Sequence, residues 1–453
     1  MSQQTYTLDQ ALAIAVEHHT AGRLAEAENI YRQILQVVPN NPSALHNLGE
    51  LAYRCKKYDA AIQLLRKAVE IEPDKAIHRN TLAVALFSNG QPDESYEACR
   101  KALELDPNLS SAHANIGICH ADRGDLPASI KSFERAIELD ANNACAHDGL
   151  GLSSLMHGDL QRGWQEQEWR WAKHDFAPRR YTSTPHWKGE DLTGKRLFIY
   201  IEQGYGDVIQ FSRYLPILAA RGIKVLMECP PELAKLLKTL PGDTQWVHAG
   251  MPIAPACDVA CPLMSVPLWC GTTLQTIPAS IPYMKADAEL VQRWRAFFST
   301  DPNLKVGICW AGRPTHTNDH NRSTSLSSFA PLADLPGITF YSLQKGPPAA
   351  QAAKPPAGMR LIDLGPRLDT FDTTAAILCN LDLLISVDTS PIHLAGAMAR
   401  PVWSILPFCP DWRWMRDRLD TPWYPTMRLF RLPTRGDWPG AMAEVRAALK
   451  EKL

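Results

Sequence analysis

Polar residues that could bind an anion follow a short apolar run near residue 388. The apolar, partly β-branched run over 383–387 predicts a buried parallel strand, and Pro391 suits the first turn of a helix that follows. Free backbone amides and the helix dipole at such a helix N-terminus attract phosphate. The side chains beside it are Asp388, Thr389, Ser390 and His393. Because Asp and Ser also cap helices without any ligand, this stretch alone leaves a phosphate site and a plain cap both open.

A glycine-containing turn, Glu202-Gln-Gly-Tyr-Gly-Asp207, follows an earlier predicted strand over 196–201. Glycines let the backbone approach a ligand closely, and we expect Asp207 at the start of a helix over 208–220. A carboxylate there is either a general base or a helix N-cap, and both interpretations stay open. The turn lacks the Gly-x-Gly-x-x-Gly spacing, which argues against a dehydrogenase. The positions expected to line a cleft here are Gln203, Gly204 and Gly206.

A long polar loop over 310–325 follows a third predicted strand. Arg313 and Arg322 can neutralise a phosphate, because arginine gives planar bidentate contacts. The hydroxyl donors beside them are Thr315, Thr317 and Ser323, and Gly312 is expected to line the cleft. A solvated loop without a ligand is the alternative. The spacing of His316, Asp319 and His320 fits no zinc template, so no metal is predicted.

Alternating strand and helix patterns must position these three stretches. They occupy residues 185–285 and restart over 286–453. Such alternation predicts two successive α/β domains with doubly wound parallel sheets, whose ligand lies between their carboxyl edges. With the helical repeats described below, the fold class is therefore α + α/β, with one α/β domain over 185–285 and a second over 286–453.

Residues 8–175 repeat with a period of 34. Proline recurs at Pro39, Pro73 and Pro107, and glycine recurs at the turn inside each repeat except where Lys56 stands. The period and the residue types resemble the tetratricopeptide repeat, with four full copies and a partial fifth. This predicts a solenoid of helix pairs whose concave groove holds an extended peptide or another protein. Trp164, Trp169 and Trp171 follow the last copy, and we expect them to be packing residues.

Composition and charge exclude several classes of function. The chain of 453 residues has 47 basic and 48 acidic side chains, a formal net charge of −1, so no basic field favours nucleic acid. The start of the chain does not resemble a signal peptide, and no run of eighteen apolar residues occurs. The eleven cysteines lie mostly in apolar runs, as expected for core thiols in a reducing compartment. We therefore predict a cytoplasmic protein without a membrane span.

Residues 185–440 resemble the heptosyltransferase-type glycosyltransferases of family 9, in the bacterial subgroup that joins them to amino-terminal tetratricopeptide repeats. The matching motifs include Ser386-Val-Asp-Thr-Ser-Pro-Ile-His-Leu-Ala-Gly396, Gly307-Ile-Cys-Trp-Ala-Gly312 and Asp411-Trp-Arg-Trp414, together with 202–216, 318–323, 341–344 and 422–425. The resemblance implies a GT-B fold of two Rossmann-like domains. It also implies inverting, metal-independent sugar transfer from a nucleotide diphosphate sugar, with no cofactor.

The resemblance also implies roles for individual residues. Asp207 matches the base that deprotonates the acceptor hydroxyl. Arg322 stands where heptosyltransferases tend to carry a phosphate-binding lysine, and Gln344 stands where they carry an acidic residue near the ribose. The residues matching the donor motif are Asp388, Thr389, Ser390 and His393, with Ser323 beside the phosphate.

Two functions are therefore expected from the sequence. The first is a glycosyltransferase whose repeats recruit a protein or a glycan-assembly partner. The second is a repeat-based scaffold with a catalytically silent transferase-like domain. The sequence favours the enzyme because Asp207, Arg322, Asp388 and His393 all retain side chains suited to the chemistry.

Overall fold

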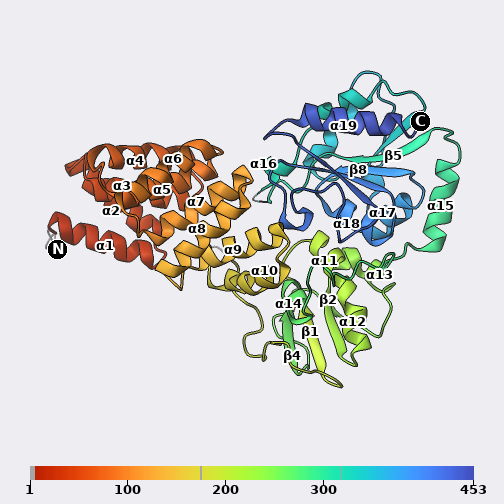
Figure 1. Cartoon of the computed structure of the whole chain (residues 1–453), viewed down its shortest axis with the longest axis horizontal. Coiled ribbons are helices and arrows are strands. Elements are labelled where there is room, and N and C mark those ends of the chain that lie inside the picture. The colour runs from red at the N-terminus through yellow and green to blue at the C-terminus, as the bar shows by residue number, and fades with distance from the viewer. Residues whose placement is uncertain (1–5, 174–175, 317) are drawn as a thin grey trace, which may run out of the picture. The chain divides into compact units, whose positions relative to one another are not determined.

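The computed structural model describes residues 6–173, 176–316 and 318–453, so Thr317 lies outside the described residues. The chain forms two compact units (Figure 1). The first unit ends at Ser154 and includes Trp169–Phe176, and the second comprises Leu155–Glu168 and Ala177–Leu453. Each unit is described by itself.

Consecutive helix pairs build the N-terminal solenoid, as the repeat predicts. The helices are α1 (Leu8–Thr20), α2 (Leu24–Val37), α3 (Pro42–Arg54), α4 (Tyr58–Ile71), α5 (Ala76–Ser88), α6 (Pro92–Leu105), α7 (Ser110–Arg123), α8 (Leu126–Leu139), α9 (Ala144–His157) and α10 (Leu160–Gln167). The second helices of the first three pairs, α2, α4 and α6, each end two residues before the repeating prolines. Proline therefore marks the end of each of these repeats, because it cannot continue a helix.

The turn inside each pair needs a left-handed backbone. Gly22, Gly90, Gly124 and Gly158 have φ angles between 75° and 96°, a region that glycine enters without a steric penalty. Lys56 occupies the same repeat position and has a φ of 58°. The turn geometry is thus kept even in the one copy where the sequence departs from glycine.

Small residues let the paired helices approach closely. The position five residues after each turn is buried in every copy and is occupied by Ala27, Ala61, Ser95, Ser129 and Gly163. A Cβ atom added at Gly117 would lie 2.9 Å from the ring of Phe133, so α7 and α8 pack without room for a side chain there. This close packing provides the apolar burial that a stack of short helices requires.

The second unit begins its α/β part with a parallel four-stranded sheet, which we call the sheet of the N-terminal lobe. Its strands are β1 (Arg196–Tyr200), β2 (Lys224–Cys229), β3 (Gln245–His248) and β4 (Val259–Pro262), in the order β3-β2-β1-β4. The helices of this lobe are α11 (Tyr205–Phe211), α12 (Leu215–Ala220), α13 (Ala234–Leu237) and α14 (Val266–Trp269), with 3-10 turns η2 (Ser212–Tyr214), η3 (Pro231–Leu233) and η4 (Leu263–Ser265). The predicted single helix over 208–220 is wrong: α11 begins at Tyr205, and η2 interrupts the helix before Pro216. A proline in the first turn favours a new helix start at that point.

The C-terminal lobe contains a parallel six-stranded sheet. Its strands are β5 (Leu304–Cys309), β6 (Ile338–Ser342), β7 (Leu361–Asp363), β8 (Leu383–Val387), β9 (Val402–Leu406) and β10 (Met427–Arg431), in the order β10-β9-β8-β5-β6-β7. If the strands are counted from β5, this is the order 3-2-1-4-5-6 of dinucleotide-binding folds, read from the far edge. The direction of strand order reverses between β5 and β8, where such sheets bind their ligands.

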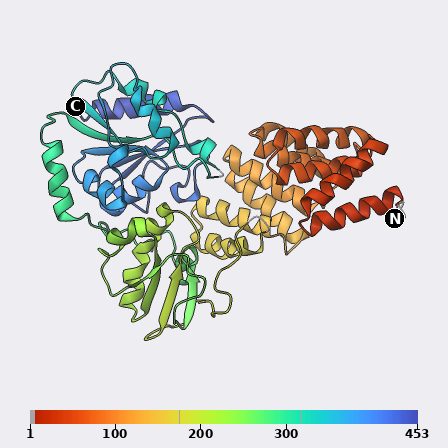
Figure 2. The ribbon, with the colours of Figure 1, turned by 180° about the vertical axis from the view of Figure 1, so that it is seen from behind.

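Helices cover both faces of this sheet. They are α15 (Ala288–Phe298), α16 (Asp319–Arg322), α17 (Phe371–Leu378), α18 (Ser390–Ala397) and α19 (Trp438–Lys450). Figures 1 and 2 show α19 on one face of the sheet and α17 and α18 on the other. The 3-10 segments are η5 (Leu326–Leu332), η6 (Pro347–Ala353), η7 (Gly365–Arg367) and η8 (Trp412–Trp414), and η5 replaces the α-helix expected after Ser325.

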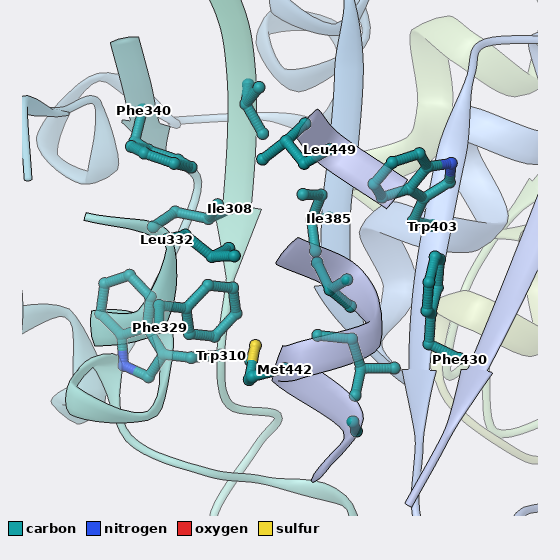
Figure 3. Packing of buried hydrophobic residues seen from close by; sticks show 14 of the residues in the cluster. Ile308, Trp310, Phe329, Leu332, Phe340, Ile385, Trp403, Phe430, Met442 and Leu449 are labelled. Atoms are coloured by element: carbon teal, nitrogen blue, oxygen red, sulfur yellow. The ribbon is translucent and has the colours of Figure 1, made fainter. Parts of the chain in front are cut away.

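The core of the C-terminal lobe lies between the sheet, η5 and α19. Figure 3 shows Ile308 and Ile385 from the central strands packing towards Phe329, Met442 and Leu449. All these side chains are buried, which explains why the central strands read as continuous apolar runs.

Among the described residues, no helix combines the length and the apolar character that crossing a membrane requires. The eleven cysteines are free thiols.

Candidate active site

The end of β8 and the start of α18 form one side of the candidate site. The strand covers Leu383–Val387 as the sequence predicts, and Thr389 is the N-cap residue of α18. The hydroxyl of Thr389 does not cap the helix; it lies 3.4 Å from the carbonyl of Val387 and 3.3 Å from the hydroxyl of Ser386. The N-cap residue is Thr389 and it forms no side-chain cap bond, so the plain-cap interpretation of Asp388 and Ser390 does not hold. Of the first three helical residues, Pro391 has no N–H and Ile392 donates its N–H to the carbonyl of Thr389 at 3.1 Å, so the amide that could meet an anion is that of Ser390.

Asp388 is buried, with 8% of its surface exposed. Its Oδ2 atom accepts a hydrogen bond of 2.8 Å from the indole Nε1 of Trp414, and its Oδ1 atom lies 3.9 Å from Nε2 of His393. The other ring nitrogen of His393, Nδ1, lies 3.1 Å from the hydroxyl of Tyr424. These contacts fix the carboxylate and the imidazole beside the first turn of α18.

The first turn of α11 forms the opposite side of the site. Gly204 is its N-cap residue, and Asp207 is the third helical residue, within the helix instead of before it. The Oδ2 atom of Asp207 accepts from the backbone N–H of Gly204 at 2.9 Å, while Oδ1 accepts from Nη2 of Arg413. Asp207 thus satisfies a helix amide with one oxygen and forms a buried ion pair with the other. The prediction that Asp207 is itself the N-cap is wrong.

Arg413 and Trp414 connect the two carboxylates. They are consecutive residues at the end of η8, and they bond Asp207 and Asp388 respectively. α11 also packs directly on α18, and a Cβ atom on Gly206 would lie only 2.9 Å from Cδ2 of His393. The structure therefore brings Asp207 and Asp388, from different lobes, into one largely buried cluster of polar side chains at the carboxyl edges of both sheets.

Arg322 lies at the end of α16 with 18% of its side chain exposed. Its Nε atom is 3.5 Å from Oδ1 of Asp319 and has no hydrogen-bond partner. A Cβ atom on Gly312 would lie 2.8 Å from Nη2 of Arg322. The absence of a side chain at Gly312 therefore leaves room for the guanidinium group against the backbone. The hydroxyl of Ser323 accepts from the N–H of Gly312 and donates to Asp319, both at 2.8 Å. Ser323 and Asp319 thus hold the loop that presents Arg322.

Gln344 is buried, and its amide group is fully used by the protein. Its Oε1 atom accepts from the N–H groups of Trp310 and Ala311 at 2.9 Å, and its Nε2 atom donates to two backbone carbonyls. It therefore fixes the chain after β5 at the point where strand order reverses. The ribose contact that the resemblance implies stays a prediction, and what the structure shows is this positioning role.

Other predicted positions lie at the rim. Gln203 and Gly204 are exposed, and Ser390 is half-buried at the first position of α18. Arg313 and Thr315 are exposed in the loop before α16. Within the described residues, no group of three or more His, Cys, Asp or Glu side chains is arranged to hold a metal ion.

Burial and charge shift the pKa values of the central groups. Burial, opposed by Arg413, raises the pKa of Asp207. Burial raises the pKa of Asp388 to about 6, and the nearby carboxylate of Asp411 adds to this effect. Burial, with help from Arg413, Arg213 and Arg322, holds the pKa of His393 well below its usual value. His393 is therefore neutral at pH 7, and the positive charge of the polar cluster comes from arginines.

The sequence reasoning assigned no role to Arg413, Trp414, Gln210 or Tyr424. Their signal was the cluster of aromatic and arginine residues over 411–414 and 422–425, which was noted only as part of a resemblance. The contacts of this cluster span more than 200 residues of chain, from Gln210 to Arg413. Two surface hollows of about 510 and 400 Å³ are both lined by Pro216 and Pro241, and neither is lined by Asp207, Asp388 or Arg413. The second adjoins the polar cluster through Arg213, which donates to the carbonyl of Gln210 at 2.8 Å.

Comparisons with known proteins identify the solenoid. The tetratricopeptide repeat family matches over residues 18–83 and 80–144. The N-terminal helix pairs are therefore tetratricopeptide repeats, an architecture whose concave surface binds proteins or peptides.

Protein FlbA of Caulobacter vibrioides is 29% identical over 318 residues, which cover 64% of this chain and 52% of FlbA. The chain thus spans about half the length of this relative. Several solved structures are similar to about a third of this chain. They include MamA (22% identity, 34% of this chain and 91% of that chain, TM-score 0.30), YrrB, a TPR protein with an unusual peptide-binding site (19%, 36% and 84%, TM-score 0.30), and the type IV pilus biogenesis factor PilW (23%, 36% and 78%, TM-score 0.34).

Proposed function

We propose that the second unit is an inverting, metal-independent glycosyltransferase of GT-B fold. It moves a sugar from a nucleotide diphosphate sugar to an acceptor hydroxyl. The observation that carries this proposal is the pairing of Asp207 and Asp388 through the consecutive residues Arg413 and Trp414. Asp388 follows β8 at the reversal of strand order, where α/β sheets bind nucleotides.

The donor diphosphate would lie against the first turn of α18, with Arg322 beside it. Positive potential there stabilises the charge that develops as the bond to the sugar breaks. Asp388 and His393, buried and hydrogen-bonded, would face the sugar. The donor occupies the C-terminal lobe in this proposal, because these groups all belong to that lobe.

The acceptor would enter from the N-terminal lobe. Asp207 takes the proton from the acceptor hydroxyl, whose oxygen attacks the anomeric carbon. The bond from that carbon to the diphosphate oxygen breaks, and its electron pair leaves with the diphosphate. In this proposal the base belongs to the N-terminal lobe and the leaving diphosphate is bound by the C-terminal lobe, which is the arrangement that a direct displacement with inversion needs.

The repeats would recruit the acceptor or a glycan-assembly partner in the cytoplasm. The alternative is a scaffold whose transferase-like unit turns nothing over, and the tetratricopeptide matches are consistent with it as well. The two functions differ in one measurable quantity, which is donor turnover.

A thermal-shift panel of nucleoside diphosphates and nucleotide sugars identifies the donor. Mass spectrometry then follows donor consumption in the presence of lysate acceptors, with D207A as the control. We expect consumption by the native chain and a loss of at least about 100-fold in D207A. Donor binding without turnover, unaffected by D207A, would establish the scaffold instead.

A further inference from the structure

Arg413 is buried in the polar cluster and bonded on three sides. Its Nη2 atom donates to Asp207, Nη1 donates to Asp411 at 2.9 Å, and Nε donates to Oε1 of Gln210 at 2.7 Å. The ring of Trp412 lies under the guanidinium group, 4.4 Å from its carbon to the ring centroid. A planar fork that is held at every edge has one orientation only.

The carboxylate of Asp207 is consequently fixed at both oxygens. The N–H of Gly204 holds Oδ2, and Arg413 holds Oδ1. A carboxylate held in this way cannot rotate about its Cβ–Cγ bond without breaking an ion pair in a buried site, which is costly. Its remaining lone pairs therefore face a constant direction.

We propose that Arg413 is a positioning residue that orients the carboxylate of Asp207 and maintains its negative charge until it accepts the acceptor's proton. This inference rests on the proposed transferase function. When the hydroxyl proton moves to Asp207, that side chain becomes neutral and Arg413 loses one counter-charge. Asp411 remains bonded to Arg413, so the guanidinium group is never left unpaired in the polar cluster.

Other charged and titratable groups also act on Asp207. Asp411 raises the pKa of Asp207, opposing Arg413. His316, in the loop before α16, interacts electrostatically with Asp207 and Asp411. Charged and titratable groups close to this pair include His393 of α18, whose ring faces Gly206, and Asp388 after β8; the charges of Arg413 and of Arg322 in α16 act on both.

Two substitutions with opposite expected effects test the proposal in the full chain. R413Q removes the charge, so the acid limb of the kcat/KM pH profile should move up by about 1–3 pH units. Loss of orientation should lower kcat roughly 10- to 100-fold.

D411N removes a negative charge near Asp207 and leaves Asp207 as the carboxylate that pairs with Arg413. The pKa of Asp207 should fall, so the acid limb should move to lower pH. Asparagine still caps η8, and the side chain of Asp411 is 39% exposed, so this variant should fold.

R418Q is the matched control. Arg418 lies in the same segment and forms an ion pair with the exposed Asp420 at 2.7 Å, away from the polar cluster. Its removal should leave the pH profile unchanged. R413K should recover part of the kcat, because lysine keeps the charge without the fork. An unmoved acid limb in both R413Q and D411N overturns the proposal, and if R413Q does not fold, the direction of the D411N shift decides alone.

A native chain that consumes no donor at any pH would instead disprove the proposed function. The coupling in stability between Arg413 and Asp207 is then measured from the thermal midpoints of D207N, R413Q and the variant that carries both substitutions. We expect R413Q to lower the midpoint less in the D207N background than in the native one. Additive changes would overturn the positioning role independently of turnover.

Discussion

Gly206 is the point where the backbone of α11 comes closest to the side chain of His393. A Cβ atom there would lie 2.9 Å from Cδ2 and 3.3 Å from Nε2 of the ring. The ring cannot move away freely, because His393 is 6% exposed and its other nitrogen is bonded to Tyr424. We expect G206A to push α11 from α18 and to lower the free energy of unfolding by about 1–3 kcal/mol. Chemical denaturation measures the loss, and the thermal-shift panel measures weaker nucleotide binding.

Gly204 supplies the control for this prediction. A Cβ atom on Gly204 would meet only Oδ2 of Asp207, at an ordinary distance of 3.7 Å, and its φ of −79° suits any residue. Alanine is a poorer N-cap than glycine but also stiffens the unfolded chain, and these effects oppose one another. G204A should therefore be close to the native chain in stability. Equal losses in G204A and G206A would contradict the close contact.

Asp388 should make stability depend on pH. Burial raises its pKa from about 3.9 in the unfolded chain to about 6, so the folded state binds its proton more tightly. The resulting stabilisation is complete below pH 4 and is lost as pH rises through 6, a difference on the order of 2–3 kcal/mol. D388N cannot ionise and keeps an acceptor for Trp414. Its thermal midpoint should rise relative to the native chain between pH 4 and pH 7.

D420N should show the opposite sign. The exposed ion pair with Arg418 lowers the pKa of Asp420, so ionised Asp420 favours folding above the unfolded pKa and loses this effect as pH falls. The midpoint of D420N should thus approach that of the native chain at low pH. A D388N curve that runs parallel to the native one would show that Asp388 is not buried in its charged form.

At the scale of the element, the turn between α3 and α4 contains the residue that departs from the repeat. Lys56 has a φ of 58° where the other copies have glycine, and a side chain in the left-handed region costs about 1–2 kcal/mol. Replacing Lys56 with glycine removes this backbone strain. Glycine also increases the conformational entropy of the unfolded chain, which cancels part of the stabilisation. We expect K56G to stabilise the solenoid by up to about 1 kcal/mol, measured by thermal denaturation followed by circular dichroism.

Gly90 gives the reverse substitution in the next repeat. Its φ is 76°, and a Cβ atom there would meet nothing within 4 Å, so backbone strain is the sole cost of G90A. G90A should lower the midpoint where K56G raises it. A loss of stability in K56G would mean that the lysine side chain contributes more than its backbone strain costs.

Elements with a strong local signal were predictable from the sequence. β8 and β9 occupy the predicted residues because continuous apolar runs have no other place in a globular fold. The solenoid helices follow from a fixed period. β10, by contrast, lies at the sheet edge with Arg428 exposed, and β7 has three residues, so neither gives a clear pattern. These two segments form strands because they pair with neighbouring strands of the sheet, and their own residues do not predict a strand.

The site was predictable only where it follows an element. Asp388 and Asp207 were found because each comes directly after a recognisable strand and turn. The ion pair of Asp207 with Arg413 joins positions 206 residues apart, and no local pattern encodes such a distance. The role of Gln344 was missed for the same reason, since the backbone groups that it bonds belong to the chain after β5.

At the scale of the molecule, topology decides where the chemistry lies. In the N-terminal lobe β1 lies between β2 and β4, and in the C-terminal lobe β8 lies beside β5. Each reversal of strand order brings the carboxyl ends of strands that are distant in the sequence to one edge of the sheet. Met264, after β4, lies 3.9 Å from Nη2 of Arg413, so the reversal of the first sheet also reaches the polar cluster. If all these residues belonged to one sheet, they could supply a base or an anion site. They could not place the two groups facing each other.

A donor held by amides and arginines should not need a divalent cation. At a concentration about 100 times its Kd, the cognate nucleoside diphosphate should stabilise the unit that binds it by about 2.7 kcal/mol. For a unit of this size that corresponds to a rise in thermal midpoint of roughly 4 °C. Because Arg322 and the amides of α18 supply the positive potential, EDTA should change neither this shift nor donor consumption. Loss of both with EDTA and their return with Mg²⁺ would show that a metal bridges the diphosphate, and that the arginine-based site described here is incomplete.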